Sequence, residues 1–303
     1  MKVITITLNP AFDVYCFSEN FGAYRENLAR IISRDAGGKG INIGRALSAF
    51  SVGVENIVAL GEDNGEEFVS LLSSEGLSVS EISVPGRIRE NITVSTDNGA
   101  ETRISFPGFS ADDSLLERAL AVILPRVEAG DVVTFSGRLP TGVTHGGVMS
   151  FLRAIKKNGA RLVLDSHALG REDVISLSPW LIKPNEEEME RYIGNCRGRD
   201  EISRAALRLV GCGIENVLVS LGGDGAVLAN SEGAFFVGAP SIPVKSTVGA
   251  GDSSIAGFIY ASLQNRSGVD LLRCAVAFGS GACMKVGTAA PDVCDVEEIL
   301  SKI

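Results

Sequence analysis

The stretch "STVGAGDSSIAGF" (246–258) is the strongest indication of how this chain folds. It places Gly249, Ala250 and Gly251 directly before Asp252, and an apolar run follows. Because small residues tolerate close approach and unusual backbone angles, successive N–H groups in this turn can point toward one bound anion. A helix that begins near Gly251 adds the positive potential of its amino end. Asp252 then either takes a proton from an attacking hydroxyl or is an ordinary first-turn aspartate, which helices favour.

An alternation of strands and helices surrounds this stretch and predicts the fold class. It implies right-handed βαβ units and a mostly parallel central sheet with helices on both faces. Such sheets bind ligands at the carboxyl ends of their strands, where Asn9, Ser136, Asp165, Asn185 and Ser220 stand. The strands are expected at 2–8, 54–60, 131–137, 161–166, 180–185 and 216–222, and the helices at 39–50, 65–75, 112–127, 144–158, 199–212, 251–265 and 268–285.

Two segments break this alternation. Residues 11–34 and 85–109 consist of short alternating patterns with hairpin turns, of which "DNG" (97–99) is the clearest. We expect them to form a small β-sheet apart from the core, serving as a lid or as a dimer surface. The α/β core then consists of residues 1–10, 35–84 and 110–303.

The bulk composition excludes several classes of function. The chain has 303 residues, of which 45% are hydrophobic and 21% charged, as in an ordinary globular protein. Its formal net charge of −9 argues against general nucleic-acid binding, which needs clustered Lys and Arg. An anionic substrate would need local Arg, Lys or helix amides.

The cysteines and the N-terminus indicate the compartment. Six scattered cysteines without a C-x-x-C pair are typical of reduced thiols in the cytosol. The opening "MKVITITLNP" is too short for a signal peptide or a membrane span, and no apolar stretch of 18 residues occurs elsewhere. We therefore expect a cytoplasmic protein without a membrane partner.

A second glycine cluster, "AGGKGINIGRAL" (36–47), opens an amphipathic pattern. Gly37 and Gly38 would let a substrate lie against the backbone, while Lys39 and Asn42 offer donors to sugar hydroxyls or phosphate. A plain glycine turn with a solvated lysine is the alternative. The cluster has neither the order of a dinucleotide fingerprint nor that of a Walker A loop.

Several single residues could hold a phosphorylated sugar. Asp13 could accept hydrogen bonds from two adjacent hydroxyls, and Arg89 and Arg103 are suited to bidentate phosphate contacts. Ser136 and Arg138 follow the strand at 131–137 and could join them. By itself, each of these residues is more often an ordinary turn or surface residue than a ligand.

Two further motifs point to nucleotide and metal. In "KPNEEE" (183–188), Asn185 and Glu188 share one helix face, as water-mediated Mg²⁺ binding requires, although the same pair can form a capping box. In "VSLGGDGAVL" (219–228), Ser220 and the glycines 222–225 could cradle phosphates or simply make a hairpin.

Taken together and in order, these motifs resemble the ribokinase/PfkB carbohydrate kinase family over nearly the whole chain. The opening stretch is similar to the family's C-terminal signature, "GGKGIN" to its N-terminal signature, and "KPNEEE" to its N-x-x-E motif for Mg²⁺ and phosphate positioning. The resemblance implies a ribokinase-like fold with a small β-sheet lid. It makes Asp252 the catalytic base and Gly249, Ala250 and Gly251 the anion hole.

Within that family the chain looks most like the phosphosugar branch, which comprises 1-phosphofructokinases, tagatose-6-phosphate kinases and minor 6-phosphofructokinases. The resemblance implies Mg²⁺, ATP as co-substrate, a ketohexose phosphate as acceptor, and a homodimer through the lid. Fructose 1-phosphate is the preferred acceptor, although Arg103 matches the 6-phosphofructokinase members. The implied ligands are Asp13, Gly38, Lys39 and Asn42 for the sugar; Arg89, Arg103 and Ser136 for its phosphate; Lys183, Asn185, Ser220, Gly222, Gly225, Thr247, Gly249 and Gly251 for ATP; and Asn185 and Glu188, through water, for Mg²⁺.

Three positions depart from the family pattern. Ser246 stands where many members have Asp, Ser254 replaces a frequent aromatic residue, and Arg138 occupies a place where a small residue is usual.

Other functions remain as alternatives. A kinase for unphosphorylated sugars or nucleosides is disfavoured by Arg89, Arg103 and Ser136. A non-catalytic sugar-phosphate sensor is disfavoured because Asp252 and the N-x-x-E motif are intact. An NAD-dependent enzyme lacks its first-strand fingerprint.

Overall fold

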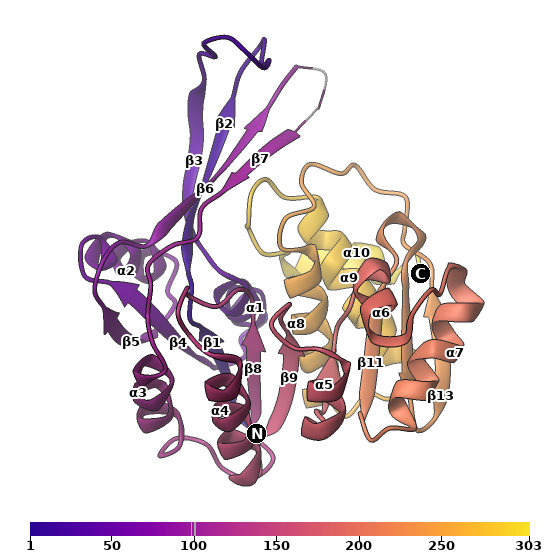
Figure 1. Ribbon diagram of the computed structural model, residues 1–303. Helices are drawn as coiled ribbons and strands as arrows, with labels where there is room; N and C mark the ends of the chain where they lie inside the picture. The colour runs from indigo at the N-terminus through magenta and orange to yellow at the C-terminus, as the bar shows by residue number, and fades with distance from the viewer. Residues whose placement is uncertain (98, 100) are drawn as a thin grey trace.

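Two β-sheets organise the chain in the computed structural model, which describes residues 1–97, 99 and 101–303 (Figure 1). The larger sheet is parallel from β5 to β11. At its other edge β12 pairs antiparallel with β11, and β13 pairs antiparallel with β12. Its strands, in spatial order, are β13 (Gly233–Val237), β12 (Ala226–Asn230), β11 (Asn216–Ser220), β10 (Leu181–Ile182), β9 (Arg161–Asp165), β8 (Val132–Ser136), β1 (Val3–Thr7), β4 (Val54–Gly61) and β5 (Val79–Val84).

The central strand β1 shows why this sheet forms. All five of its residues, "VITIT", are buried, and β-branched side chains suit a strand that is covered on both faces. Val3 aligns with Val54 of β4 on one side and with Val132 of β8 on the other. The parallel register brings the carboxyl ends of these strands to one edge, as the sequence predicted.

Helices cover both faces of the large sheet and bury two hydrophobic clusters. One cluster includes Leu115, Leu152 and Leu209 from α3, α4 and α7, and the other includes Phe258 and Leu272 from α8 and α9. The helices are α1 (Lys39–Ser48), α2 (Gly65–Ser74), α3 (Ser114–Ile123), α4 (His145–Lys157), α5 (Arg171–Leu177), α6 (Glu186–Ile193), α7 (Gly198–Val210), α8 (Ala250–Leu263), α9 (Gly268–Cys283) and α10 (Val293–Leu300).

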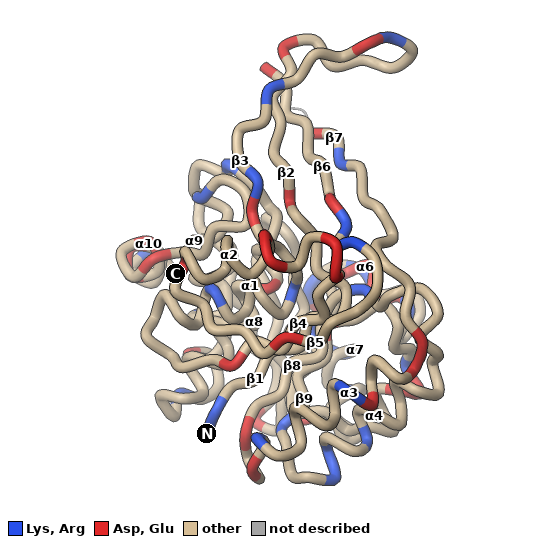
Figure 2. The backbone as a smooth tube through the Cα atoms, turned by 90° about the vertical axis from the view of Figure 1, so that its left-hand side faces the viewer, with Lys and Arg blue, Asp and Glu red and all other residues tan. Residues whose placement is uncertain are grey.

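The four-stranded small sheet projects from the core above the carboxyl edge of the large sheet (Figures 1 and 2). Its order is β3 (Arg30–Gly37), β2 (Ala11–Phe17), β6 (Arg89–Ser95) and β7 (Glu101–Ser105). β3 continues past the expected boundary at residue 34 to Gly37, so the small sheet runs directly into the glycine cluster before α1. The expected "DNG" turn includes Asn98, which lies outside the described residues.

The expected strands and helices are present, and several short elements were missed. The sequence reading did not include α5, α10 and the edge strands β5 and β13. These elements are short, and tertiary packing supplies the contacts that stabilise them. All six cysteines are free thiols. Among the described residues, no helix is both long and apolar enough to cross a membrane.

Candidate active site

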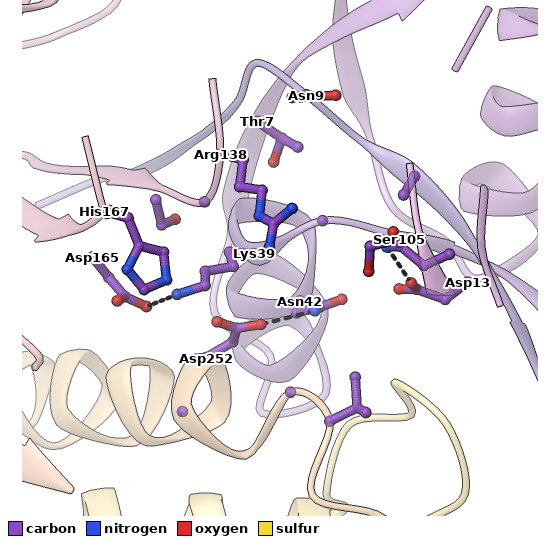
Figure 3. A pocket seen from close by; sticks show the side chains of 18 of the residues that line it. Thr7, Asn9, Asp13, Lys39, Asn42, Ser105, Arg138, Asp165, His167 and Asp252 are labelled. Atoms are coloured by element: carbon purple, nitrogen blue, oxygen red, sulfur yellow. Dashed lines mark hydrogen bonds and ion pairs between the residues drawn. The ribbon is translucent and has the colours of Figure 1, made fainter. Parts of the chain in front are cut away.

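A pocket of about 530 Å³ lies where the strands of the large sheet end, beneath the small sheet. Its lining comes from both sheets and from the first turns of α1 and α8 (Figure 3). The fold thus gathers residues that are more than 200 positions apart, such as Asp13 and Asp252. The expected site residues that line it are Asp13, Gly38, Lys39, Asn42, Arg89, Arg103, Ser136, Lys183, Asn185, Thr247, Gly249, Gly251 and Asp252.

The glycine turn before α8 has the geometry that its sequence predicted. Gly249 caps the helix with φ 78°, a left-handed conformation that favours glycine. Asp252 follows in the first turn and is only 6% exposed. Its carboxylate Oδ2 accepts a hydrogen bond from Asn42 Nδ2 at 2.8 Å, and Arg45 Nη1 donates to Asn42 Oδ1 at 2.9 Å, which fixes that amide's orientation. These two hydrogen bonds hold the Asp252 carboxylate in a fixed position in the pocket.

The second glycine cluster (36–47) lies directly against the small sheet. A side chain at Gly37 would place its Cβ 1.9 Å from Asp13 Oδ2, so no larger residue fits there. Thr7 Oγ1 accepts from the backbone N–H of Ile41 at 3.1 Å, which fastens the start of α1 to the end of β1. Lys39, in the first turn of α1, consequently points into the pocket (Figure 3).

A buried cluster of charges surrounds Asp252. Lys39 Nζ lies 2.9 Å from Oδ2 of Asp165, a buried residue at the end of β9. Burial raises the pKa of Asp252 to about 6; the charge of Lys39 opposes this shift and that of Asp165 adds to it. Burial would also raise the pKa of Asp165, but the nearby ammonium groups of Lys183 and Lys39 outweigh it and lower that pKa.

The environments of these two carboxyl groups therefore push their pKa values apart. Such a pair suggests separate roles, with Asp252 able to gain and lose a proton near neutral pH while Asp165 stays ionised. Burial opposes the charge of Lys39, yet its two carboxylate neighbours raise its pKa, so it remains an ammonium ion. The cluster can hold a proton acceptor beside a fixed positive charge.

The wall under the small sheet holds Asp13. Its Oδ1 accepts from Asn91 Nδ2 at 2.8 Å, and Arg103 Nη2 lies 3.6 Å from the same oxygen. Burial raises the pKa of Asp13, opposed by the Asn91 hydrogen bond and the Arg103 charge. Ser136 Oγ is buried and has no hydrogen-bond partner among the described residues, and neither has Asn9 Oδ1. Because buried polar atoms are normally paired, these two oxygens point to a bound ligand.

Three arginines stand at this side of the pocket. Arg89 Nη1 donates to Phe106 O at 2.9 Å and to Asn91 Oδ1 at 3.3 Å, and Arg89 Nη2 donates to Asn9 O at 3.3 Å. Arg103 and Arg138 line the same pocket. On a chain with net charge −9, this local excess of guanidinium groups favours an anionic ligand.

The "KPNEEE" motif forms a capping box, which was the structural alternative to Mg²⁺ binding in its interpretation. Asn185 Oδ1 accepts from the Glu188 backbone N–H, and Glu188 Oε2 accepts from the Asn185 N–H, both at 2.8 Å. The other carboxylate oxygen, Oε1, is 3.2 Å from His167 Nδ1. Glu188 lines a smaller adjoining pocket of about 130 Å³, which shares Asp165, His167 and Lys183 with the main one.

Not every expected residue reaches the main pocket. Ser220 and Gly222 line a separate shallow pocket with Asn185, and Gly225 ends the turn that leads into β12. Ala250 begins α8 without being part of the main lining. A bridge between Asn185 and Ser220 links the two pockets through the backbone.

Other lining residues were outside the expected site. Asp165 was noted as a strand end, and no site role was expected for His167, Asn91 or Ser105. The strand-end rule could have found Asp165 and its neighbour His167, because both follow β9. Asn91 and Ser105 depend on how β6 and β7 pair, which short alternating patterns do not specify.

Comparison with known proteins identifies the family of the chain. The family described as pfkB family carbohydrate kinase matches residues 3–293. The chain is 31% identical over 303 residues to the 1-phosphofructokinase of Escherichia coli strain K12, covering 100% of this chain and 97% of that protein. It is 30% identical over 294 residues to the 1-phosphofructokinase of Rhodobacter capsulatus, covering 96% and 93% of the two chains.

The fold also matches a solved structure. The phosphofructokinase-2 of Escherichia coli in complex with substrates and products superposes with a TM-score of 0.93 at 29% identity, covering 99% of each chain. This chain belongs to the pfkB family of carbohydrate kinases and is a phosphotransferase that uses ATP as its co-substrate.

Proposed function

We propose that this kinase is a 1-phosphofructokinase, which converts fructose 1-phosphate to fructose 1,6-bisphosphate. The observation that carries this proposal is that one pocket is lined both by the buried carboxyl of Asp252, which Figure 3 shows, and by three arginines, Arg89, Arg103 and Arg138. A ketose that carries a phosphate at one end can present its other terminal hydroxyl to Asp252. The relatives at 30–31% identity named above carry the same name.

In the proposed reaction, Asp252 accepts the proton of the attacking hydroxyl. The hydroxyl oxygen forms a bond to the γ-phosphorus as the bond to the leaving ADP oxygen breaks, and the proton passes from Asp252 to solvent after transfer. The amides of the turn at 249–251 and the ammonium of Lys39 face the charge on the transferring group. Positioning and electrostatics dominate such reactions, so a preformed site of this kind is sufficient.

Mg²⁺ would neutralise phosphate charge when it is bound with ATP. We propose that Asn185 and Glu188 position it through water. Both oxygens of Glu188 already have protein partners, and the described residues contain no group of three or more His, Cys, Asp or Glu side chains suited to a metal. A contact through water and phosphate oxygens fits this donor set, as is common for Mg²⁺.

A matched pair of capping boxes tests this metal role. Asp292 and Asp295 form the same box at the start of α10, outside the residues that line the pocket. Glu188→Gln and Asp295→Asn should each destabilise a cap by about 1 kcal/mol. Only Glu188→Gln should raise the Mg²⁺ concentration that gives half-maximal turnover. An equal effect in both variants would leave Glu188 with a purely structural role.

We further propose that the small sheet acts as a lid and joins two copies of the chain. Its outer part exposes large apolar side chains, including Leu28, Ile31, Ile104 and Phe106. Exposed large apolar side chains of this kind favour association. Analytical ultracentrifugation of the wild type and of Ile31→Lys with Ile104→Lys should show a dimer that becomes monomeric. A wild-type monomer at micromolar concentration would contradict this assembly.

An assay of ADP release against fructose 1-phosphate, fructose 6-phosphate and tagatose 6-phosphate tests the acceptor. We expect the highest kcat/KM with fructose 1-phosphate. Arg103, placed in the pocket beside Asp13, favours a second candidate, 6-phosphofructokinase, which fructose 6-phosphate would reveal. Turnover of fructose or a nucleoside in preference to all three would contradict the phosphosugar assignment.

A further inference from the structure

Arg45 on α1 makes hydrogen bonds to three separate parts of the fold. Its Nε and Nη2 donate to the two carboxylate oxygens of Glu75, the C-cap of α2, at 2.5 and 3.2 Å. Nη2 also donates to the backbone oxygen of Ala36 in β3 at 2.6 Å, and Nη1 donates to Asn42 Oδ1 at 2.9 Å. The Arg45 side chain is only 11% exposed and is not among the described residues that line the pocket. The protein itself therefore holds this guanidinium in place.

The side-chain amide of Asn42 connects Arg45 with Asp252. The two ends of a primary amide have similar shapes, so their partners decide which end faces which way. Because a guanidinium only donates, Arg45 requires the amide oxygen Oδ1 on its own side. The Nδ2 group then faces the buried Asp252 and donates to its Oδ2 at 2.8 Å, a hydrogen bond that Figure 3 marks. Arg45 thus selects the end of the amide that Asp252 meets.

The reversed amide would favour the other protonation state of Asp252. With Nδ2 toward it, the ionised carboxylate has a donor, and this hydrogen bond lowers the pKa of Asp252. With Oδ1 toward it, the ionised form would meet an acceptor, whereas a protonated carboxyl group could donate to that oxygen. Burial already favours the protonated form. An amide free to turn would therefore stabilise the form of Asp252 that cannot accept a proton.

The charge of Arg45 is matched by neighbours other than Asp252. Glu75 takes two of its nitrogens, and the Arg45 charge also opposes the burial that raises the pKa of Asp35. The charged groups that act on Asp252 itself come from α1, β9 and the segment after β10, and they are Lys39, Asp165 and Lys183. An influence of Arg45 on Asp252 should therefore pass mainly through the Asn42 amide and not through its charge.

We propose that Arg45 is a positioning residue for phosphoryl transfer, which fixes the Asn42 amide with its donor end toward Asp252 and so keeps that carboxylate able to accept the proton of the attacking hydroxyl. This inference rests on the proposed function, since it requires Asp252 to act as the base. Glu75 supports the arrangement by holding two nitrogens of the guanidinium, and Ala36 O holds its far end. The planar, donor-only fork of arginine suits this task.

The pH dependence of kcat/KM tests this role in Arg45→Met and in the control Arg126→Met. It is measured with the acceptor that gives the highest turnover. Arg126 forms a comparable ion pair, with its Nε 2.7 Å from Glu55 Oε1, and is outside the described lining of the pocket. Arg45→Met should move the acidic limb upward by about one pH unit, as expected when a charged group loses a hydrogen bond. Relative to the control, kcat/KM should fall about tenfold at pH 5 and stay within about twofold at pH 9.

Two results would overturn the inference. An equal loss at pH 5 and pH 9 would give Arg45 a purely structural role. The second concerns Asn42→Ala, which has no amide to orient, so that adding Arg45→Met should not move the limb further. A shift of the same size in that background would assign the effect to the charge of Arg45.

Two other substitutions at the same position protect the test against misfolding. Arg45→Lys still only donates, so its acidic limb should stay close to that of the wild type. Arg45→Gln remains polar in this buried place, but its amide accepts as well as donates and does not impose one orientation on Asn42. If Arg45→Met does not fold, Arg45→Gln should show an upward shift, and an unmoved limb in that variant would contradict the role of Arg45.

A titration of the protein without substrates separates this inference from the proposed function. In protein with ¹³C-labelled aspartate carboxyl groups, the nuclear magnetic resonance signal that is missing from Asp252→Asn reports on Asp252. We expect Arg45→Met to move the midpoint of that signal upward in pH, as it moves the acidic limb of kcat/KM. If Asp252→Asn keeps wild-type turnover, the proposed base fails and this inference fails with it. If Asp252→Asn is inactive and the midpoint does not move in Arg45→Met, only the inference fails.

Discussion

The two sides of the pocket handle charge in opposite ways. Asp252 and Asp165 are 6% and 5% exposed, and their charges are matched within the protein by Lys39 and Lys183. On the other side, the Arg103 side chain is 46% exposed and Arg138 has no partner among the described residues. The charges on the first side are paired within the protein, whereas on the second side Arg138 would gain a partner only when an anion binds.

This difference separates chemistry from recognition. A buried, internally paired cluster fixes the position and the protonation of a reacting group, because little reorganisation accompanies the reaction. Exposed guanidinium groups bind an incoming phosphate at a smaller desolvation cost than buried ones. Substitutions on the carboxylate side should therefore change turnover and stability, and those on the arginine side should change ligand affinity.

The largest expected effect comes from Asp252→Asn, which removes the proposed base. Turnover should fall by about 10²- to 10⁴-fold, the usual contribution of general base catalysis. KM for both substrates should stay within a few-fold, because Asn retains an oxygen for the Asn42 hydrogen bond. ADP release measures the effect, and circular dichroism shows that the variant folds. Turnover above a tenth of wild type would contradict the assignment of Asp252.

The next largest effect is expected for Lys39→Met, which should lower the free energy of unfolding. It leaves Asp165 and Asp252 buried together without their nearest shared cation, although Lys183 remains. We expect a loss of about 2–3 kcal/mol in the free energy of unfolding, below the value for a fully buried pair because Lys39 is partly exposed. Chemical denaturation measures this loss, and Lys157→Met, on the exposed end of α4, is the control. Equal stability of the two variants would show that the pair contributes little.

The pH dependence sharpens the comparison further. Because the pKa of Asp252 is raised to about 6, kcat/KM should fall about tenfold per pH unit as the pH drops below that value. The acidic limb belongs to the coupled cluster and not to Asp252 alone. Lys39→Met should move this limb to higher pH. A profile that stays flat down to pH 5 would contradict the raised pKa.

The same pKa makes a stability prediction of defined sign. Between about pH 4 and 6 the native state holds the Asp252 proton more tightly than the unfolded chain does, so this group's contribution to stability decreases as the pH rises through that window. Asp252→Asn has no carboxyl group to ionise and therefore avoids the cost of burying a charged carboxylate. Its melting temperature should exceed that of the wild type at pH 8, and the difference should vanish near pH 4.

The smallest expected effect concerns the hydrogen bond between strand β2 of the small sheet and the loop that precedes α8. Tyr15 OH on β2 lies 3.2 Å from Ser246 Oγ, which also accepts from the Val248 N–H at 3.2 Å in the loop before the glycine turn. A double-mutant cycle of Tyr15→Phe and Ser246→Ala should give a coupling of about 1 kcal/mol in stability. The exposed Tyr24→Phe serves as control. Additive effects of the two substitutions would mean that the hydrogen bond does not link them.

Local sequence was sufficient for much of the carboxylate side. The glycine turn, the helix that follows it and the place of Asp252 were all predicted, because turn and helix signals act over a few residues. The capping box of Asn185 and Glu188 was likewise readable as one of two alternatives. Its proposed connection with Mg²⁺ stays a prediction.

Tertiary structure decided the partners. Asp165 was only a strand end in the sequence, and its pairing with Lys39 joins residues 126 positions apart. The expected phosphate contact of Arg89 stays a prediction, while its hydrogen bonds to the Asn9 and Phe106 carbonyls depend on how the small sheet packs against the core. The parallel pairing of β2 with β6 is equally invisible in two separate hairpin patterns.

The parallel sheet, the two glycine turns and the residue that we propose as the base could be predicted from local patterns, since periodicity, turn chemistry and helix starts are local properties. The pairing of charges, in contrast, became visible only in the folded chain. That pairing depends on burial and on contacts between distant segments, which set the pKa of Asp252 and leave Arg138 without a partner in the described chain.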